Sequence, residues 1–346
     1  MKALLLSKYR QLELADVADP AVNGDEVLIR VAACGICGSD VHGYDGSSGR
    51  RIPPIVMGHE ASGRIAAIGA GVKQFSEGDR VTLDSTIYCG ACWHCSRGEV
   101  NLCDKRQVLG VSCNEYRRAG AFAEYVAVPE RIVYPLPDNL DFADAAMLEA
   151  VAVAIHAVSL ASVPPGSTAL VLGAGTIGLL VLQALRAAGC SRVFISDIDD
   201  SRLKLAKELG ATDLVNAGAD AVGNVLELTG GTGVDVAVEA VGRNETVDAA
   251  INSVRKGGTV VLVGNISAEV TLPLQKVVTR QIRLQGSCAS AGEYPKAIDL
   301  MAKGTIRVKP LITAVAPLDD GPQWFERLYA REPNLMKVVL TPGNAS

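Results

Sequence analysis

The chain has 346 residues, of which 49% are hydrophobic and 21% charged, and its formal net charge is −5 at pH 7. This length favours about two domains, each large enough to bury an apolar core. No block of basic residues is present, so nucleic acid and anionic membrane surfaces are not indicated as partners. The nine cysteines are an odd number, and the apolar stretch at residues 3–6 is too short for a secretory signal core. We therefore expect a cytoplasmic protein with reduced or metal-bound thiols.

The first part of the chain is rich in short β-type segments separated by Gly, Pro and Asp. This spacing is typical of an irregular all-β barrel rather than of a parallel sheet. The predicted strands cover residues 26–32, 61–68, 80–83 and 122–128, and residues 337–340 form one more isolated strand near the other end. We therefore assign residues 1–150 and 288–346 to one domain.

Cys37, His59 and Glu60 lie in two glycine-rich segments of this first part. A catalytic zinc ion uses about three protein ligands and keeps one position open for water or substrate. Cysteine, histidine and a carboxylate can supply those three ligands. Two alternatives remain open at this point: Cys34 and Cys37 could form a redox pair, and His59 could be a packed polar residue.

Four cysteines follow at the spacing C-x2-C-x2-C-x7-C, between residues 89 and 103. Thiolates at such short intervals can bind one tetrahedral zinc ion, and Gly90 and Gly98 give the backbone the freedom to wrap it. Four sulfur ligands leave no position for substrate, so the expected role is structural. Two disulfides or four unrelated thiols are the alternative, which the tight spacing disfavours. The predicted ligands are Cys89, Cys92, Cys95 and Cys103.

From about residue 150 the pattern changes to strands that alternate with helices. Such alternation, with helices of about 10–15 residues, is typical of an α/β fold with a parallel, doubly wound sheet. We assign residues 151–287 to this second domain. Its predicted strands cover residues 169–172, 192–196, 235–239 and 259–263, and the predicted helices cover residues 150–161, 177–188, 201–209 and 246–255.

Residues 168–185 contain no charged side chain, which approaches the length of a membrane span. Gly173, Gly175 and Gly178 interrupt this stretch after a short β-type segment. That punctuation favours a strand, a tight turn and a buried helix over a membrane span.

The same three glycines form a G-x-G-x-x-G motif after a predicted strand and at the start of a helix. In dinucleotide-binding folds the first glycine makes the turn, the second admits the pyrophosphate and the third packs the helix on the strand. Asp197 follows nineteen positions after Gly178, where a carboxylate can bind ribose hydroxyls and repel a 2′-phosphate, which favours NAD over NADP. The candidate cofactor-binding residues are Gly173, Gly175, Ile177, Gly178, Asp197, Arg202, Val241, Val263 and Gly264. Arg202 could instead be a solvated helix charge, and the last three could be simple turn residues.

These motifs, in their order along the chain, resemble the zinc-containing medium-chain alcohol dehydrogenases over essentially the whole length. The resemblance rests on Cys-Gly-Ser-Asp-x-His at 37–42, Gly-His-Glu at 58–60, the four cysteines and the glycine motif. It implies a GroES-like β-barrel domain with two zinc ions and a Rossmann domain that binds NAD. The segment around Glu149 is most similar to polyol dehydrogenases of the sorbitol (L-iditol) type, although Ala150 replaces the proline that usually follows this glutamate.

The resemblance also implies roles for the first set of metal-type residues. Cys37 and His59 would bind the catalytic zinc ion, and Glu60 or Glu149 would be its third ligand or a water-bridged neighbour. Asp40 would orient the ligand histidine, as buried carboxylates commonly do for metal-bound imidazoles.

Ser39 matches the hydroxyl that takes the alcohol proton, and His42 matches the imidazole that passes it outward. Hydride transfer needs an alkoxide, which zinc favours by stabilising the anion. The implied reaction is hydride transfer from a secondary alcohol of a polyol or diol to NAD, giving a ketose or ketone. Such enzymes are commonly homo-oligomers, with tetramers frequent in the polyol branch.

One departure from the family pattern leaves the substrate open. Sorbitol-type enzymes carry an aromatic–arginine pair where this chain has Cys288-Ala289. Related polyols, vicinal diols, threonine-like amino alcohols and a polyol phosphate remain open, the last if Arg50 and Arg51 are more than solvated charges. Two other classes of protein remain as alternatives: a non-catalytic NAD(H)-binding zinc protein and a zinc-free quinone reductase.

Of the remaining residues, Cys34, Cys113, Cys190 and Cys288 are expected in the core, and His94 and His156 are expected to be structural.

Overall fold

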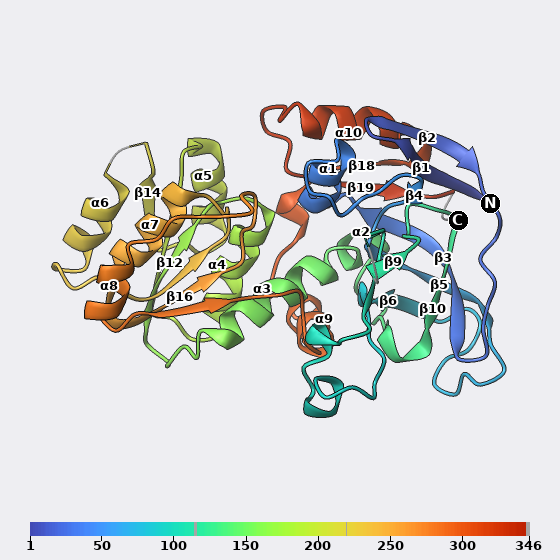
Figure 1. Ribbon diagram of the computed structural model, residues 1–346, viewed down its shortest axis with the longest axis horizontal. Coiled ribbons are helices and arrows are strands. Elements are labelled where there is room, and N and C mark those ends of the chain that lie inside the picture. The colour runs from blue at the N-terminus through green and yellow to red at the C-terminus, as the bar shows by residue number, and fades with distance from the viewer. Residues whose placement is uncertain (114–115, 219, 344–346) are drawn as a thin grey trace. The chain divides into compact units, whose positions relative to one another are not determined.

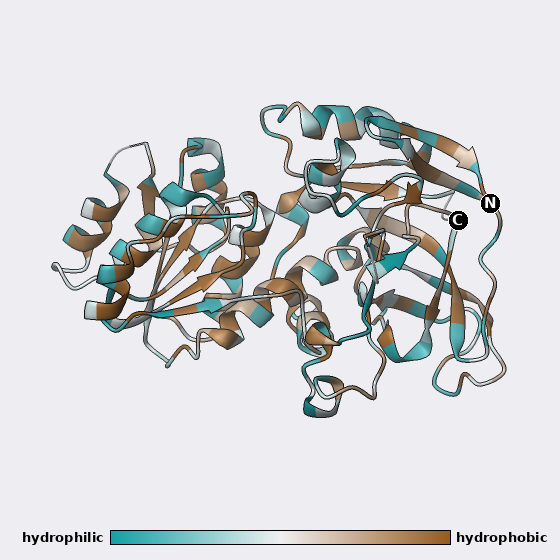
Figure 2. Cartoon of the chain, viewed as in Figure 1, coloured by the Kyte–Doolittle hydropathy of each residue, from teal (hydrophilic) through white to brown (hydrophobic). Residues whose placement is uncertain are grey.

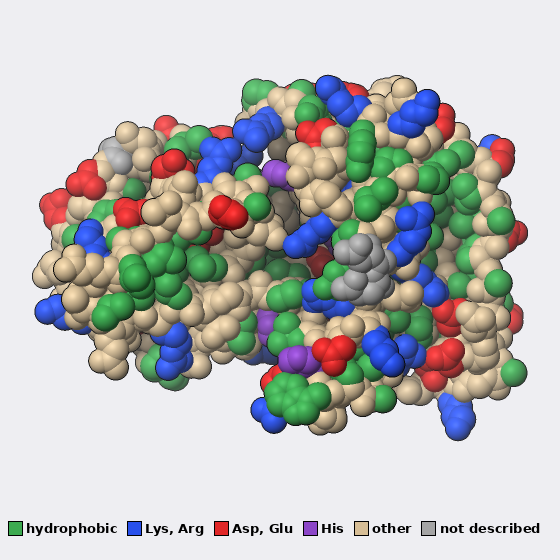
Figure 3. Space-filling model, viewed as in Figure 1, with side chains coloured by type: hydrophobic (Ala, Val, Ile, Leu, Met, Phe, Trp, Pro, Cys, Tyr) green, Lys and Arg blue, Asp and Glu red, His purple; other side chains and the backbone are tan. Residues whose placement is uncertain are grey.

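The computed structural model describes residues 1–113, 116–218 and 220–343. No helix within these ranges is long and apolar enough to cross a membrane. Acidic and basic side chains are interspersed on the face seen in Figure 3, in keeping with the lack of a basic block. The chain divides into two compact units (Figure 1), of which the first comprises Met1–Glu149, Tyr294–Ala302 and Val308–Ser346 and the second comprises Ala150–Glu293 and Lys303–Arg307.

The first unit is built on a seven-stranded sheet with the strand order β11-β6-β5-β3-β19-β18, in which β10 also pairs with β3. Its pairs are antiparallel except for β18 and β19. Two smaller sheets have the orders β2-β1-β4 and β7-β8-β9. The strands are β1 (Lys2–Lys8), β2 (Gln11–Asp16), β3 (Glu26–Gly35), β4 (Ile55–Val56), β5 (Glu60–Ile68), β6 (Arg80–Leu83), β7 (Thr86–Ile87), β8 (Gln107–Leu109), β9 (Arg117–Arg118), β10 (Tyr125–Pro129), β11 (Val133–Pro135), β18 (Ile312–Pro317) and β19 (Lys337–Thr341).

Alternating side chains of β3 supply much of the core of this unit, with Val27, Ile29 and Val31 buried. The strand predicted at 122–128 begins at Tyr125, because the residues before it pair with β1 through an isolated bridge. The helices are α1 (Gly38–Tyr44), α2 (Phe142–Ala145), α9 (Tyr294–Ala302) and α10 (Gly321–Tyr329), with short 3-10 turns at Cys95–Arg97, Val100–Leu102, Glu130–Ile132, Lys309–Leu311 and Leu318–Asp320.

The second unit contains a six-stranded parallel sheet with the order β14-β13-β12-β15-β16-β17. Helix α4 contacts β12 and β13, and α5 contacts β13 and β14. Helix α6 contacts β14, and α7 contacts β12, β15 and β16. Helices lie on both sides of the sheet (Figure 1). The strands are β12 (Thr168–Leu172), β13 (Arg192–Asp197), β14 (Asp213–Asn216), β15 (Val234–Glu239), β16 (Val254–Leu262) and β17 (Arg283–Gly286). The helices are α3 (Leu148–Leu160), which begins in the first unit, α4 (Thr176–Ala187), α5 (Asp200–Glu208), α6 (Ala221–Leu228), α7 (Asn244–Ser253) and α8 (Leu274–Thr279).

The structure confirms the barrel-type unit and the parallel α/β sheet that the sequence predicts. Hydrophobic residues are concentrated in the strands of the parallel sheet (Figure 2). The helix predicted at 246–255 ends at Ser253, because Val254 is buried and begins β16. Strands β14 and β17 were not predicted, since their short sequences DLVN and RLQG lack β-type alternation.

The strand order reverses at β12, which lies between β13 and β15. Ligands of doubly wound sheets bind beyond the carboxyl ends of the strands at such a reversal. The glycine motif begins directly after β12, so the fold places it at the expected position for a dinucleotide.

Candidate active site

Cys37 is the N-cap residue of α1 and is fixed by the first turn of that helix. Its Sγ accepts a hydrogen bond from Ser39 N at 3.5 Å, and its own N–H donates to Asp40 Oδ2 at 3.3 Å. A reciprocal cap of this kind satisfies helix N–H groups that otherwise lack partners. The thiol is therefore held by a local motif that the sequence around it encodes.

Asp40 is fully buried and connects three functional groups. Its Oδ1 accepts hydrogen bonds from Arg51 Nη2 at 2.9 Å and Nε at 3.3 Å, and lies 3.4 Å from His59 Nδ1. Burial alone would raise the pKa of Asp40, but the charges of His59 and Arg51 outweigh it and hold this pKa well below its usual range. The carboxylate is thus ionised and lies beside the imidazole of His59.

Arg51 is buried, with 3% of its surface exposed, so the expectation that it is a solvated charge is wrong. Its Nη2 also donates to Ser39 Oγ at 3.2 Å. Gly43 provides the space for its stem, since a Cβ at that position would lie 2.1 Å from Arg51 Cγ. Burial is tolerated because the guanidinium pairs with the carboxylate of Asp40. The neighbouring Arg50 is exposed, as expected.

Cys37, His59 and Glu60 come together at one point of the first unit. The sulfur, a ring nitrogen and a carboxylate oxygen all lie within 4.8 Å of one another. Burial lowers the pKa of His59, whereas Asp40 and Cys37 raise it, and the net result is a pKa well above its ordinary value. An imidazolium cannot bind a metal, so zinc binding here must displace a proton. One thiol, one imidazole and one carboxylate are a donor set that fits zinc.

Glu60 also forms a buried ion pair that the sequence did not reveal. Lys337 Nζ lies 2.5 Å from Glu60 Oε2, with exposed fractions of 3% and 1% for the two side chains. Burial lowers the pKa of Lys337, but Glu60 outweighs this and raises it. Gly35 makes room for the carboxylate, because a Cβ there would lie 2.2 Å from Glu60 Oε2. The partners are 277 positions apart, which explains why no local pattern predicts the pair.

Glu149, at the start of α3, lies close to this group but is not one of its three members. Its Oε1 accepts a hydrogen bond from Ser85 Oγ at 3.4 Å. Burial raises the pKa of Glu149, His59 lowers it and Glu60 raises it, and the net pKa is raised. The pKa of Glu149 therefore depends on His59 and Glu60, two members of the three-residue group.

Ser39 and His42 lie three positions apart on α1, so they share one side of the helix. Ser39 is exposed and His42 is partly exposed. Because a guanidinium has no acceptor, the hydroxyl of Ser39 accepts from Arg51 and keeps its own proton available.

The four clustered cysteines converge in a lobe of the first unit, with all sulfur atoms within 4.8 Å of one another. Backbone N–H groups of Ala91 and Cys92 donate to Cys89 and lower its pKa to about 6, which favours the thiolate that a metal requires. Gly90 and Gly98 have φ of 77° and 80°, so the lobe uses backbone conformations that favour glycine. The donors fit a closed four-sulfur zinc site.

The glycine motif has the geometry of a phosphate-binding turn. Gly173 has φ of 97°, and a Cβ at Gly178 would lie 1.8 Å from Gly173 O, so both positions require glycine. A Cβ at Gly175 would meet nothing within 4 Å, which leaves open space beside the backbone at the start of α4. Ile177 follows in the first turn of that helix. This cradle fits a pyrophosphate.

Asp197 ends β13 and is fixed against the motif. Its Oδ2 accepts from Ala174 N at 2.6 Å, and its Oδ1 accepts from Asp199 N at 3.0 Å. Arg202 Nε lies 3.6 Å from Asp199 Oδ2, so its charge is shared with a helix-capping carboxylate. The structure thus brings Asp197, but not the charged end of Arg202, into contact with the glycine turn.

Val241, Val263 and Gly264 occupy two turns at the carboxyl ends of β15 and β16. A Cβ at Gly264 would lie 2.3 Å from Gly242 N, so the two turns touch. Buried Glu239 fixes the first turn by accepting from Val241 N and Gly242 N, each at 2.8 Å. Sequence reasoning missed Glu239, although a charged residue in an otherwise apolar strand was a usable signal.

The remaining cysteines and histidines are only partly as expected. Cys34 and Cys190 are buried, whereas Cys113 is partly exposed and Cys288 is exposed, so the core assignment is wrong for Cys288. The two structural histidines each contact a carboxylate: His94 Nδ1 lies 2.9 Å from Glu99 and His156 Nδ1 lies 2.7 Å from Glu293.

Two family models match the chain. The alcohol dehydrogenase GroES-like domain matches residues 23–138, and the zinc-binding dehydrogenase family matches residues 176–303. Sorbitol dehydrogenase of Bacillus subtilis (strain 168) is 35% identical over 99% of this chain and 98% of its own length. L-Idonate 5-dehydrogenase of Vitis vinifera is 36% identical over 98% of this chain and 94% of its own length.

Solved structures agree over the whole chain. An Escherichia coli oxidoreductase/dehydrogenase of unknown specificity has a TM-score of 0.94 at 32% identity, with 99% of each chain covered. The 2R,3R-butanediol dehydrogenase of Bacillus subtilis has a TM-score of 0.89 at 31% identity, also with 99% of each covered. A zinc-binding dehydrogenase of Sinorhizobium meliloti 1021, bound to NADP, has a TM-score of 0.89 at 34% identity and the same coverage. The chain therefore belongs to the zinc-containing medium-chain alcohol dehydrogenase family, as a zinc- and NAD(P)-dependent dehydrogenase of the alcohol and polyol class.

Proposed function

We propose that this enzyme oxidises a secondary hydroxyl group of a polyol or vicinal diol to a ketose or ketone, with NAD as the hydride acceptor. The observation that carries the proposal is the group of Cys37, His59 and Glu60, in which His59 and Glu60 are buried and backed by Asp40 and Lys337. The names of three similar proteins, sorbitol dehydrogenase, L-idonate 5-dehydrogenase and 2R,3R-butanediol dehydrogenase, support substrates with several hydroxyl groups.

Cys37, His59 and Glu60 would hold the catalytic zinc ion, while Lys337 pairs with Oε2 of Glu60. Glu149 would remain a carboxylate neighbour of the site, with Ser85 Oγ donating to its Oε1 at 3.4 Å. When bound, zinc stabilises negative charge on the substrate oxygen and NAD accepts hydride from the carbinol carbon. The four clustered cysteines would hold a second, structural zinc ion, giving two per chain.

Ser39 would take the proton of the substrate hydroxyl at Oγ and release its own proton toward His42. The hydrogen bond from Arg51 to Ser39 Oγ, at 3.2 Å, stabilises electron density on that oxygen while the proton moves. Arg51 would therefore act as a positioning residue for the relay. Asp40 links this relay to His59, so one carboxylate orients both the metal ligand and the guanidinium.

The carboxylate of Asp197 supports NAD over NADP. It is fixed at the glycine turn by Ala174 N, where it can accept hydrogen bonds from ribose hydroxyls and would repel a 2′-phosphate. Gly173, Gly175, Ile177 and Gly178 would cradle the pyrophosphate. Val241, Val263 and Gly264 would line the nicotinamide side of the cofactor site. Arg202 would lie at the adenosine side.

A polyol phosphate is less well supported as substrate than an uncharged polyol. That alternative relied on Arg50 and Arg51, and the guanidinium of Arg51 is committed to Asp40 and Ser39. Arg50 alone is exposed and offers a single charge. A threonine-like amino alcohol is supported by no contact among the described residues.

We also propose that the enzyme is a homo-oligomer. Leu274 and Val278 are 65% and 67% exposed and lie four positions apart on α8, so they form one apolar face. The neighbouring strand β17 is the last of its sheet, and such an edge can pair with a second copy. Light scattering after size-exclusion chromatography should give a mass of at least two chains.

The test is NADH production at 340 nm across sugar alcohols, vicinal diols, threonine and polyol phosphates, together with the zinc content. We expect turnover with at least one polyol or diol and close to two zinc ions per chain. Cys37→Ser should abolish turnover while the protein keeps its fold and its structural zinc ion. A metal-free preparation with full activity, or no oxidation of any compound by a zinc-loaded enzyme that binds NADH, would contradict the proposal.

A further inference from the structure

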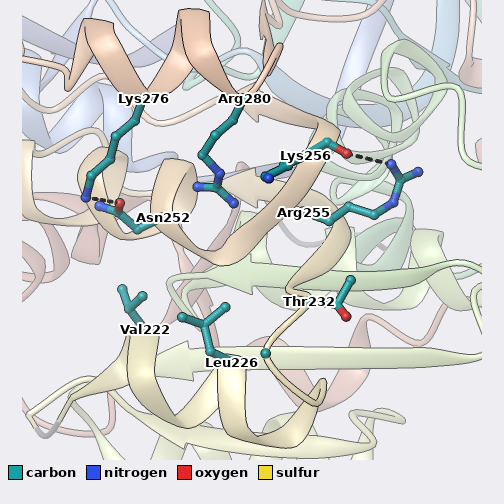
Figure 4. A pocket seen from close by; sticks show the side chains of 9 residues that line it. Val222, Leu226, Thr232, Asn252, Arg255, Lys256, Lys276 and Arg280 are labelled. Carbon is teal, nitrogen blue, oxygen red and sulfur yellow. Dashed lines mark hydrogen bonds between the residues drawn. The ribbon is translucent and has the colours of Figure 1, made fainter.

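A groove lies in the second unit at the amino-terminal ends of the parallel strands (Figure 4). Its volume is about 790 Å³. Thr232 of its lining precedes β15, and Arg255 and Lys256 lie at the start of β16. The glycine motif follows the opposite, carboxyl end of β12, so this groove is separate from the predicted dinucleotide site.

Four cations line the groove, and no acidic residue is among its lining. Arg255 donates from Nε to Asp235 Oδ1 at 2.7 Å, so its charge is compensated. In the part of the chain that the structure describes, no carboxylate lies within ion-pair distance of Lys256, Lys276 or Arg280. Three uncompensated positive charges therefore gather at one place on a chain whose formal net charge is −5.

Two of these cations are held in place by neutral acceptors. Lys276 Nζ donates to Asn252 Oδ1 at 2.6 Å, and Arg280 donates to Ile251 O at 3.2 Å and to Val254 O. An ammonium has three N–H donors and a guanidinium five, so both side chains keep donors for a ligand. Figure 4 shows Lys276 of α8 and Arg280, the residue after the end of α8, extending toward the groove, whose lining also includes Lys256. Like charges at such proximity repel, and an anion between them relieves the repulsion.

The opposite wall of the groove is apolar. Val222 and Leu226 lie four positions apart on α6 and face the cations across the groove in Figure 4. A simple inorganic anion would use only the charged side, whereas a ligand with a phosphate and an apolar part would use both. We propose that this groove binds a phosphorylated small molecule, with its phosphate on Lys256, Lys276 and Arg280 and its apolar part on Val222 and Leu226.

The test uses phenyl phosphate as probe and the full-length, zinc-loaded enzyme saturated with NADH, so that the dinucleotide site is filled. Isothermal titration calorimetry should show binding to the wild type and binding at least tenfold weaker in the Lys256→Gln/Lys276→Gln variant. Both lysines are exposed, and their replacement leaves the hydrogen bond from Arg280 to Ile251 O intact, so the variant should keep its fold. Lys204→Gln, an exposed lysine of α5 outside the groove, is the matched control and should bind like the wild type.

Two further measurements separate the sources of recognition. Leu226→Ala should weaken phenyl phosphate but leave inorganic phosphate unchanged, because only the former has an apolar part. The proposal is overturned if the wild type binds no phenyl phosphate up to about 10 mM, a limit that corresponds to negligible affinity. It is also overturned if the lysine double variant, with an unchanged melting temperature, binds the probe as the wild type does.

Discussion

Replacement of Arg51 by methionine tests the buried network behind the candidate active site. The change keeps an unbranched side chain but removes the guanidinium that donates to Asp40 at 2.9 Å and to Ser39 at 3.2 Å. Arg50→Met is the matched control, because Arg50 is the adjacent residue and is exposed.

Two effects of different size are expected from Arg51→Met. Removing the guanidinium from this buried ion pair leaves the carboxylate of Asp40 without its hydrogen-bonded partner and costs about 3–5 kcal/mol of unfolding free energy. Removing a charged donor from Ser39 Oγ costs about 1.5–3 kcal/mol where the proton moves, which corresponds to a loss in kcat of roughly ten- to a hundredfold. Among the described residues, the hydrogen bonds and ion pairs of Arg51 go to Asp40 and Ser39 and to none of the three proposed zinc ligands, so the zinc content should fall little.

The assay combines kcat from NADH absorbance, the unfolding midpoint in urea and the zinc content of each variant. Arg51→Lys keeps the positive charge but replaces the three guanidinium nitrogens with one ammonium nitrogen. Its kcat should lie between those of the wild type and Arg51→Met. Added guanidinium ion should restore part of the activity of Arg51→Met, a result that a purely structural role does not predict. The reasoning is refuted if Arg51→Met matches Arg50→Met within twofold in kcat and has the same midpoint.

Three other predictions follow from single contacts. Asp197→Ser should raise the ratio of kcat/KM for NADP to that for NAD by at least tenfold, because it removes the repulsion of a 2′-phosphate, whereas Asp200→Ser should not; an unchanged ratio would disprove the role of Asp197. Burial raises the pKa of Glu26, but the hydrogen bonds from Arg118 and Asn23 outweigh it and lower this pKa below 4.5. The stabilisation from ionised Glu26 is therefore present above pH 4.5 and is lost as the pH falls through the folded-state pKa. In Glu26→Gln, the free energy of unfolding in urea should therefore fall less steeply with decreasing pH than in the wild type. An equally steep fall in the variant would contradict this prediction. Cys92→Ser should lower the zinc content by about one ion per chain and destabilise the cysteine lobe, as measured by elemental analysis and limited proteolysis; a variant that retains both ions would exclude the four-sulfur site.

Features that depend on short stretches of chain were predictable from sequence. The four cysteines lie within fifteen consecutive residues, and the glycine motif within six, so their spacing alone specifies the geometry that a metal or a phosphate needs. The alternation of strands and helices after residue 150 likewise predicted the parallel sheet, because hydrophobic periodicity is a local property. Strands such as β17 escaped prediction, since their identity depends on pairing with β16 rather than on their own composition.

The sequence by itself determined the family, the two sets of metal-type ligands and the position of the dinucleotide turn. The tertiary structure brought a ligand atom of Glu60 within 4.8 Å of those of Cys37 and His59, and it placed Arg51 in the interior. The physical reason is the distance in sequence between the partners. The buried pair of Glu60 and Lys337 forms only when β19 pairs with β3 in the folded sheet, and no local pattern encodes which distant charge will compensate a buried one.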